Sequence, residues 1–190
     1  MSTGNPECYD TRGLPMDVEP PVVPPEVAAR AAAAVGWARA LREAAAILRH
    51  QAATFKFHPL TGERPAPGPA FLEALRRLEH VVGEIQRAPA VLLATDADLA
   101  AAGDGARRDL EATREAIARG AQLTAAAVQA LQAVLQSPNG ATLDAPYGGG
   151  APRRHHPGAL CTIVAQRAEE VAAALETGAV LAANLALRPR

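Results

Sequence analysis

Two short stretches carry the residue types that most often do chemistry in proteins. The run Arg153-Arg154-His155-His156 is followed by Cys161, and together they contain ligands for a transition metal and cations for a phosphate. Asp96 and Asp98 are separated by one residue, and paired carboxylates serve acid–base catalysis. These two stretches are the candidates for a metal, phosphate or catalytic site.

Each stretch also has a simpler structural interpretation. Asp96 and Asp98 stand in Thr-Asp-Ala-Asp, ahead of an apolar turn, where such side chains begin a helix. The Arg-His run is interpreted as a solvated basic hinge. The sequence has no HExxH, no paired CxxC and no repeated ExxH, so a zinc or di-iron site has no recognisable ligand set. We therefore predict no catalytic residue, no metal and no cofactor. A small helical enzyme or ligand binder that uses Asp96 and Asp98, or His155 and His156, stays as an alternative.

The composition favours helices and a protein partner. Of the 190 residues, 49% are hydrophobic but only 3% are aromatic, and alanine, the best helix former, supplies much of the apolar content. An alanine-rich face buries little area, which gives such a bundle a physical motive to bind a partner or itself. The net charge of −1 argues against a nucleic-acid surface. Because no apolar run reaches the ~18 residues of a membrane span and the first residues do not resemble a secretory signal, we expect a cytoplasmic protein. Two distant cysteines, Cys8 and Cys161, fit a reducing compartment.

The clearest predicted element is a helix over 105–136. One row of residues recurs every seven positions, and a second row repeats the interval with an offset of four, so that both rows form one stripe on a helix packed along other helices. The first row is Leu110, Ile117, Thr124 and Leu131, and the second is Ala121, Val128 and Leu135.

Three further helices are predicted around this one, at 25–54, 70–87 and 159–187. In the first, the apolar stripe runs through Val27, Ala31, Val35, Ala38 and Leu41 and continues to Phe55. The last helix is amphipathic as well, and it either completes the bundle or is displaced by a partner's helix that takes its place.

Proline and glycine separate these helices. We predict a disordered proline-rich arm over 1–24 and loops over 56–69 and 138–158, the last without regular structure. The stretch 90–99 fits either a short strand or a resumed helix, and helix is preferred because one strand would have no partner. The sequence thus predicts an all-α protein, a bundle of about four long helices forming a single domain over 25–190.

One region resembles a known family. The helix RRDLEATREAIARGAQLTAAAVQALQAVL followed by APYGGG, within 107–150, resembles the last helix and Tyr-Gly turn of the flagellar export chaperones for hook–filament junction proteins. The departures are the proline-rich arm, the rigid PAPGP loop and the additional C-terminal helix. The resemblance implies a cytoplasmic chaperone without catalysis that binds a partner's terminal helix along Leu123, Val128, Leu131 and Leu135.

The leading prediction is therefore a non-enzymatic protein-binding module, a chaperone or adaptor. Its contacts are expected on apolar residues of the last two long helices: Leu123, Val128, Leu131, Leu135, Leu160, Val164, Val171 and Leu175. A structural subunit of a larger assembly, in which the arm and the 138–158 loop become ordered between neighbours, is the second hypothesis. An enzyme or ligand binder is the third.

Overall fold

Four long helices form the bundle, which confirms the prediction of an all-α protein. A computed structural model describes residues 23–56, 67–88, 95, 100, 102–136, 142–143, 153–154 and 157–187. The helices are α1 (Pro25–Lys56), α2 (Pro69–Arg87), α4 (Asp104–Gln136) and α5 (Pro157–Ala186). Nearly all of the predicted arm over 1–24, most of the loop over 56–69 and most of the ambiguous stretch over 90–99 lie outside the described residues.

The helix boundaries follow from residues that the sequence places at the first turns. Pro25 and Pro69 are the first residues of α1 and α2, where the missing N–H of proline costs no hydrogen bond. Asp104 opens α4 and suits the positive end of the helix dipole. The last helix begins at Pro157, two residues earlier than predicted, because proline is tolerated in a first helical turn.

The loop predicted over 138–158 is wrong in one respect, since part of it has regular structure. Two-residue strands, β1 (Thr142–Leu143) and β2 (Arg153–Arg154), pair antiparallel. Thr142 lies opposite Arg154, and Leu143 lies opposite Arg153. Proline and glycine in the sequence between them hide this pairing from a periodicity analysis, which needs longer runs.

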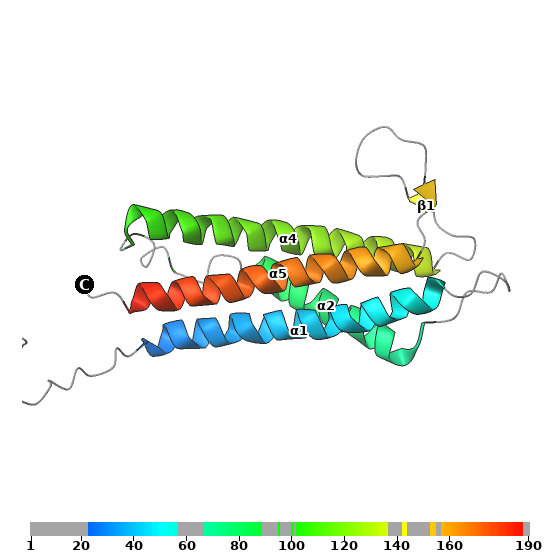
Figure 1. Cartoon of the computed structure of the whole chain (residues 1–190), viewed down its shortest axis with the longest axis horizontal. Helices are drawn as coiled ribbons and strands as arrows, with labels where there is room; N and C mark the ends of the chain where they lie inside the picture. Colours follow the sequence, from blue (N-terminus) through cyan, green and yellow to red (C-terminus); the bar gives the residue numbers. More distant parts are fainter. Residues whose placement is uncertain are drawn as a thin grey trace, which may run out of the picture.

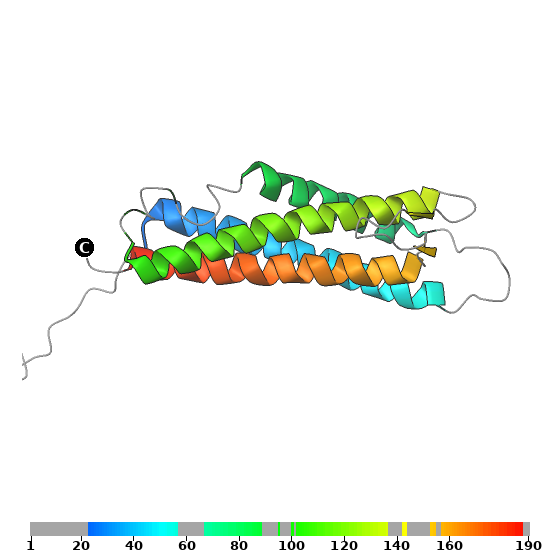
Figure 2. The same cartoon turned by 90° about the horizontal axis from the view of Figure 1, so that it is seen from above.

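The helices alternate in direction, and α5 lies between α1 and α4 (Figure 1). In the view turned by 90°, α2 lies on the side of the bundle away from α5 and covers only part of the bundle's length (Figure 2). The contacts of α5 with α1 are the most extensive, followed by those with α4, and α2 packs against α1 and α4. The last helix therefore completes the bundle in its own chain.

Small residues and two ion pairs join α1 to α5. Arg42 pairs with Glu176, and Arg49 pairs with Glu169. The two pairs lie seven residues apart on each helix, so they fix a single antiparallel register. Buried alanines also recur every seven residues on both helices, and this register sets them opposite one another, which lets the two backbones approach closely. They are Ala38, Ala45 and Ala52 on α1 and Ala165, Ala172 and Ala179 on α5.

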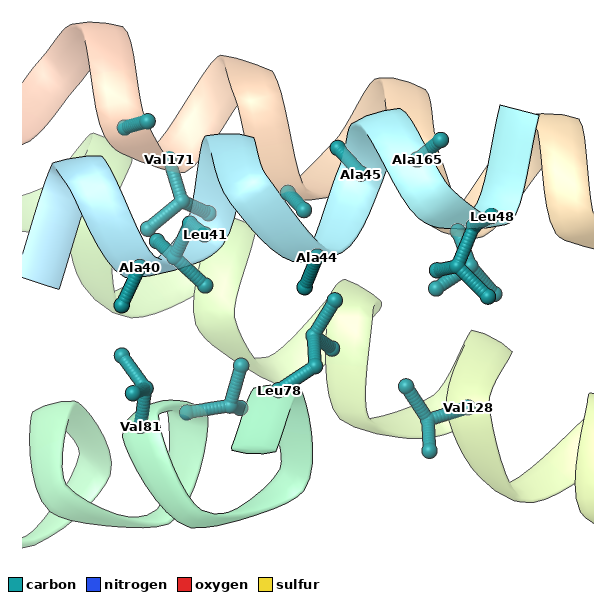
Figure 3. Packing of buried hydrophobic residues seen from close by; sticks show 14 of the residues in the cluster. Ala40, Leu41, Ala44, Ala45, Leu48, Leu78, Val81, Val128, Ala165 and Val171 are labelled. Atoms are coloured by element: carbon teal, nitrogen blue, oxygen red, sulfur yellow. The ribbon is translucent and has the colours of Figure 1, made fainter. Parts of the chain in front are cut away.

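A different side of α1 holds α2. Figure 3 shows Ala40 and Ala44 pointing toward α2, where Leu78 lies, whereas Ala45 points toward α5. Polar contacts border this interface: the Trp37 indole N–H donates to a Glu84 carboxylate oxygen at 3.1 Å, and an Arg77 nitrogen of α2 lies 2.9 Å from a Glu43 oxygen of α1. Hydrogen bonding from Arg39, supported by the charge of Arg77, holds the pKa of the Glu43 carboxyl below its usual value.

The two predicted rows of α4 face the interior. Leu110, Ile117, Thr124 and Leu131 are all at most 2% exposed, and Ala121 and Val128 are equally buried. Thr124 is the one polar side chain in the row, and its hydroxyl donates to the Gly120 carbonyl at 2.8 Å. A buried hydroxyl satisfied by its own helix costs little, so threonine fits an apolar stripe here.

One member of the predicted α1 stripe is wrongly placed. Val35 is 49% exposed, and its neighbour Ala34 is fully buried instead. The spacing of four from Ala31 and three to Ala38 predicts Val35 on the buried side. In the bundle, Ala34 continues the row of Ala38 and Ala45, and the close approach of α5 favours alanine at these positions.

Two glycines give a matched test of the packing. A Cβ at Gly120 would lie 2.8 Å from a Cγ of the buried Val171, whereas a Cβ at the exposed Gly36 would meet nothing within 4 Å. We expect Gly120→Ala to lower the free energy of unfolding by about 1–3 kcal/mol through overpacking. Gly36→Ala should raise it by up to about 1 kcal/mol through helix propensity. Urea unfolding measures both changes.

The Val171→Ala background is the control for the cause. If the loss comes from the Gly120–Val171 contact, Gly120→Ala should cost much less when Val171 is shortened. An equal cost in both backgrounds, or a stabilising Gly120→Ala, would contradict the close approach of α4 to α5 at this position.

Candidate functional site

The structure describes only some of the residues whose side chains could do chemistry. Asp96, Asp98, His155 and His156 lie outside the described residues, so their alternative roles stay predictions. Cys161 is described and is a free thiol with 0% exposure in the core. Desolvation by this burial raises the pKa of the Cys161 thiol to about 12. Within the described ranges, no three His, Cys, Asp or Glu side chains gather as metal ligands would.

Six of the eight predicted partner contacts lie inside the bundle. Each is at most 5% exposed: Val128, Leu131, Leu160, Val164, Val171 and Leu175. Leu135 is partly buried and packs against the core. Leu123 is also only partly buried, but it lines a groove on the outside of the bundle.

A partner could contact the six buried residues only after the bundle opens. Burying one Val or Leu side chain is worth about 1.5–3 kcal/mol, so exposing the four from α5 would cost on the order of 10 kcal/mol. That cost is comparable to the whole stability of a typical domain, about 5–15 kcal/mol. For the same reason, a charge at Leu131 would disrupt the fold and could not report on binding. A contact surface on the folded protein has to be sought on the outside.

The outer groove between α4 and α5 is such a surface, with a volume of about 380 Å³. We call it the α4–α5 groove. Its apolar floor contains the small residues Gly120, Ala116 and Ala174 together with Val171 and Leu123, and Gly120 lies directly against Val171. Small side chains leave room for a third helix to approach both backbones.

Charged pairs line the rims of this groove. On α4, Arg119 pairs with Glu115, and on α5 an Arg167 nitrogen lies 2.7 Å from a Glu170 oxygen. All four side chains are well exposed, so these pairs add little stability and both signs stay accessible at each rim.

The lining residues follow one side of each helix. On α4, Ala112, Ala116, Arg119 and Leu123 succeed one another at intervals of four, three and four. On α5, Arg167, Glu170 and Ala174 succeed one another at intervals of three and four. Ile163 is 43% exposed and extends the apolar side of α5 beyond the residues that line the groove. The surface thus combines an apolar floor with paired charges, which fits the apolar face and charged flanks of an amphipathic helix.

No family model, curated protein or solved structure matches this chain. The candidate site is therefore defined by its geometry.

A second groove of about 320 Å³ lies where α4 begins and α5 ends. Asp109 and Asn184 are its polar lining residues, among Ala106, Leu181 and Leu185. Asp109 is its one charged lining residue, so its lining holds no pair of opposite charges like those of the α4–α5 groove. None of the described helices combines the length and apolarity that crossing a membrane requires.

The buried thiol makes stability depend on alkaline pH. The folded chain keeps the Cys161 proton up to about pH 12, whereas the unfolded chain loses it near its ordinary pKa of 9.0. The contribution of the protonated Cys161 thiol to the free energy of unfolding is complete below pH 9.0. Between that pH and about pH 12 it falls by about 1.4 kcal/mol per pH unit. Urea unfolding at about pH 8 and about pH 10 should show a smaller loss for Cys161→Ala than for the wild type. Equal losses would mean that the thiol ionises freely in the folded protein.

Proposed function

We propose that this protein is a non-enzymatic binding module that holds an α-helix of another protein in the α4–α5 groove. One observation carries the proposal: the groove floor around Gly120, Ala116 and Ala174 is small enough for a third helix to pack directly against two others. The partner segment is an amphipathic helix with small apolar residues on its contact face and charges of both signs on its flanks. The class is that of an adaptor or chaperone, in the cytoplasm.

The rims support this choice of partner. Arg119 and Glu115 on one side, and Arg167 and Glu170 on the other, exchange partners readily because they are exposed. A bound helix with Glu and Arg along its flanks would extend these pairs across the interface and fix its register. A strongly acidic or basic segment would meet like charges at both rims, so the charge pattern selects against it.

Leu123 is the hydrophobic contact expected at one end of this interface. Two predicted partner-binding residues line the groove, and Leu123 is the more exposed of them, because Val171 is only 1% exposed. The resemblance to flagellar export chaperones implies the same kind of ligand, a partner's helix. The proposal differs in the surface, because Val128 and Leu131 lie in the protein's own core.

The proposal predicts that filling the groove weakens binding of the partner's helix without disturbing the fold. Ala116 is exposed and lines the groove, so Ala116→Arg places a long side chain where the partner's helix would lie. Ala133→Arg is the matched control, because Ala133 is exposed on the same helix and does not line the groove. We expect Ala116→Arg to weaken binding at least about tenfold and Ala133→Arg to leave it unchanged.

The measurement has two stages. Wild-type and variant proteins are used to capture partners from a lysate of the native organism, and the helix of the captured protein that cross-links to α4 or α5 is then made as a peptide and titrated against all three proteins. Equal affinity for Ala116→Arg and wild type would rule out the α4–α5 groove as the contact. A partner that binds through a non-helical segment would contradict the proposed ligand class.

A further inference from the structure

The opposite edge of α5, where it meets α1, carries a second outer surface that the proposed function does not use. Val35 of α1 and Val180 of α5 are the most exposed large hydrophobic side chains of the described residues, at 49% and 59%. Exposed small residues continue along the same sides of the two helices. We call this surface the α1–α5 face and define it by Val35, Arg42, Ala46, Arg49 and Ala53 of α1 with Thr162, Glu169, Ala173, Glu176 and Val180 of α5.

The register of α1 against α5 orders this face into layers. The Arg42–Glu176 and Arg49–Glu169 pairs fix which residues lie at the same level. Val35 precedes Arg42 by seven residues and Val180 follows Glu176 by four, so the two valines lie within about one helical turn of each other. By the same register, Ala46 and Ala173 lie between the two ion pairs. Apolar layers therefore alternate with ion-pair layers along the bundle.

The charges of this face are segregated by helix. In its two ion-pair layers, α1 contributes only arginine and α5 contributes only glutamate. Their side chains are between 34% and 51% exposed, so each can also meet a charge from outside the chain. A surface with one positive and one negative helix is complementary to itself in one orientation.

Two twofold arrangements would bring a second copy onto this face. An axis across the helices sets α1 against α1 of the second copy, which places arginine rows together and glutamate rows together. An axis along the helices sets α1 against α5 of the second copy. Arg42 then meets Glu176, and Val35 meets Val180. Because like charges across an interface are costly and opposite charges fix register, the pattern selects the axis along the helices.

The face has the area of a small dimer interface. From Val35 to Ala53, α1 extends about 27 Å, and two adjacent helices are about 18 Å wide. The face therefore covers roughly 500 Å² per copy, or about 1,000 Å² in total, which is the lower limit for a specific interface.

We propose that the protein forms a homodimer through the α1–α5 face, with its twofold axis parallel to the helices. Val35 of each copy packs against Val180 of the other, and the Arg42–Glu176 and Arg49–Glu169 pairs join into networks across the interface. The dimer leaves the α4–α5 groove on the other edge of α5, so dimerisation and partner binding are separate properties and each can fail without the other.

Sedimentation of the full chain at micromolar concentration tests the proposal. The wild type should sediment as a dimer, and Val180→Lys should weaken the association at least about tenfold because it buries a charge in an apolar layer twice per dimer. Leu72→Lys is the matched control, since Leu72 is 38% exposed on α2, away from this face, and should leave the dimer intact. A monomeric wild type, or a Val180→Lys protein that still forms the dimer, would overturn the proposal.

A disulfide test distinguishes the two axes and uses conservative substitutions. In a Cys8→Ser background, where Cys161 is buried, a tagged Val35→Cys chain is mixed with an untagged Val180→Cys chain and oxidised. The proposed dimer forms a disulfide between tagged and untagged chains in the mixture and none in either variant alone. Disulfide dimers in each variant alone, without the mixed product, would establish the other axis and overturn the proposal.

Discussion

The close antiparallel approach of α1 and α5 is the constraint on which the rest of the bundle depends. Alanine at every seventh position on both helices, as at Ala45 and Ala172, lets the backbones come together, and dispersion contacts along the whole length replace the area that larger side chains would bury. This explains how a chain with few aromatic residues forms a continuous core. It also fixes the position of α5, which must then present its other side to α4.

The two outer surfaces follow from that arrangement. Because α5 packs between α1 and α4, the outward side of α5 borders the α1–α5 face along one edge and the α4–α5 groove along the other. The α4–α5 groove has Gly120 in its floor and charges of both signs on its rims. The α1–α5 face carries one sign of charge on each helix in its ion-pair layers. Charges of both signs on a rim complement a helix of mixed charge, whereas charges segregated by helix complement a second copy of the same face. The two sides of α5 thus offer two different kinds of charge complementarity.

Much of the fold could be predicted from the sequence, because period and punctuation are local properties. The sevenfold recurrence of Leu110, Ile117 and Leu131 marks the buried side of α4, and prolines mark the starts of α1 and α2. Most of the candidate site could not be predicted from the sequence. A stripe shows that residues are buried but not whether a partner or the same chain buries them, so the sequence alone predicts that Val128 and Leu131 contact a partner. The α4–α5 groove depends on the distance between two helices far apart in sequence, and only Leu123 and Val171 of the predicted partner-binding residues line it.

The pairing of α1 with α5 also has a consequence for how the chain reaches its folded state. The ion pairs that set their register join residues 120 and 134 positions apart, so the largest helix interface is also highly non-local. Helical bundles fold fast when their contacts are local. Contacts between distant residues slow folding, because the entropy cost of closing the long intervening loop comes before the contacts form. During synthesis, α1 leaves the ribosome with its alanine stripe exposed. More than a hundred further residues must be synthesised before the paired residues of α5 can cover it. The early helices therefore have a prolonged period in which contacts with other chains compete with the native one.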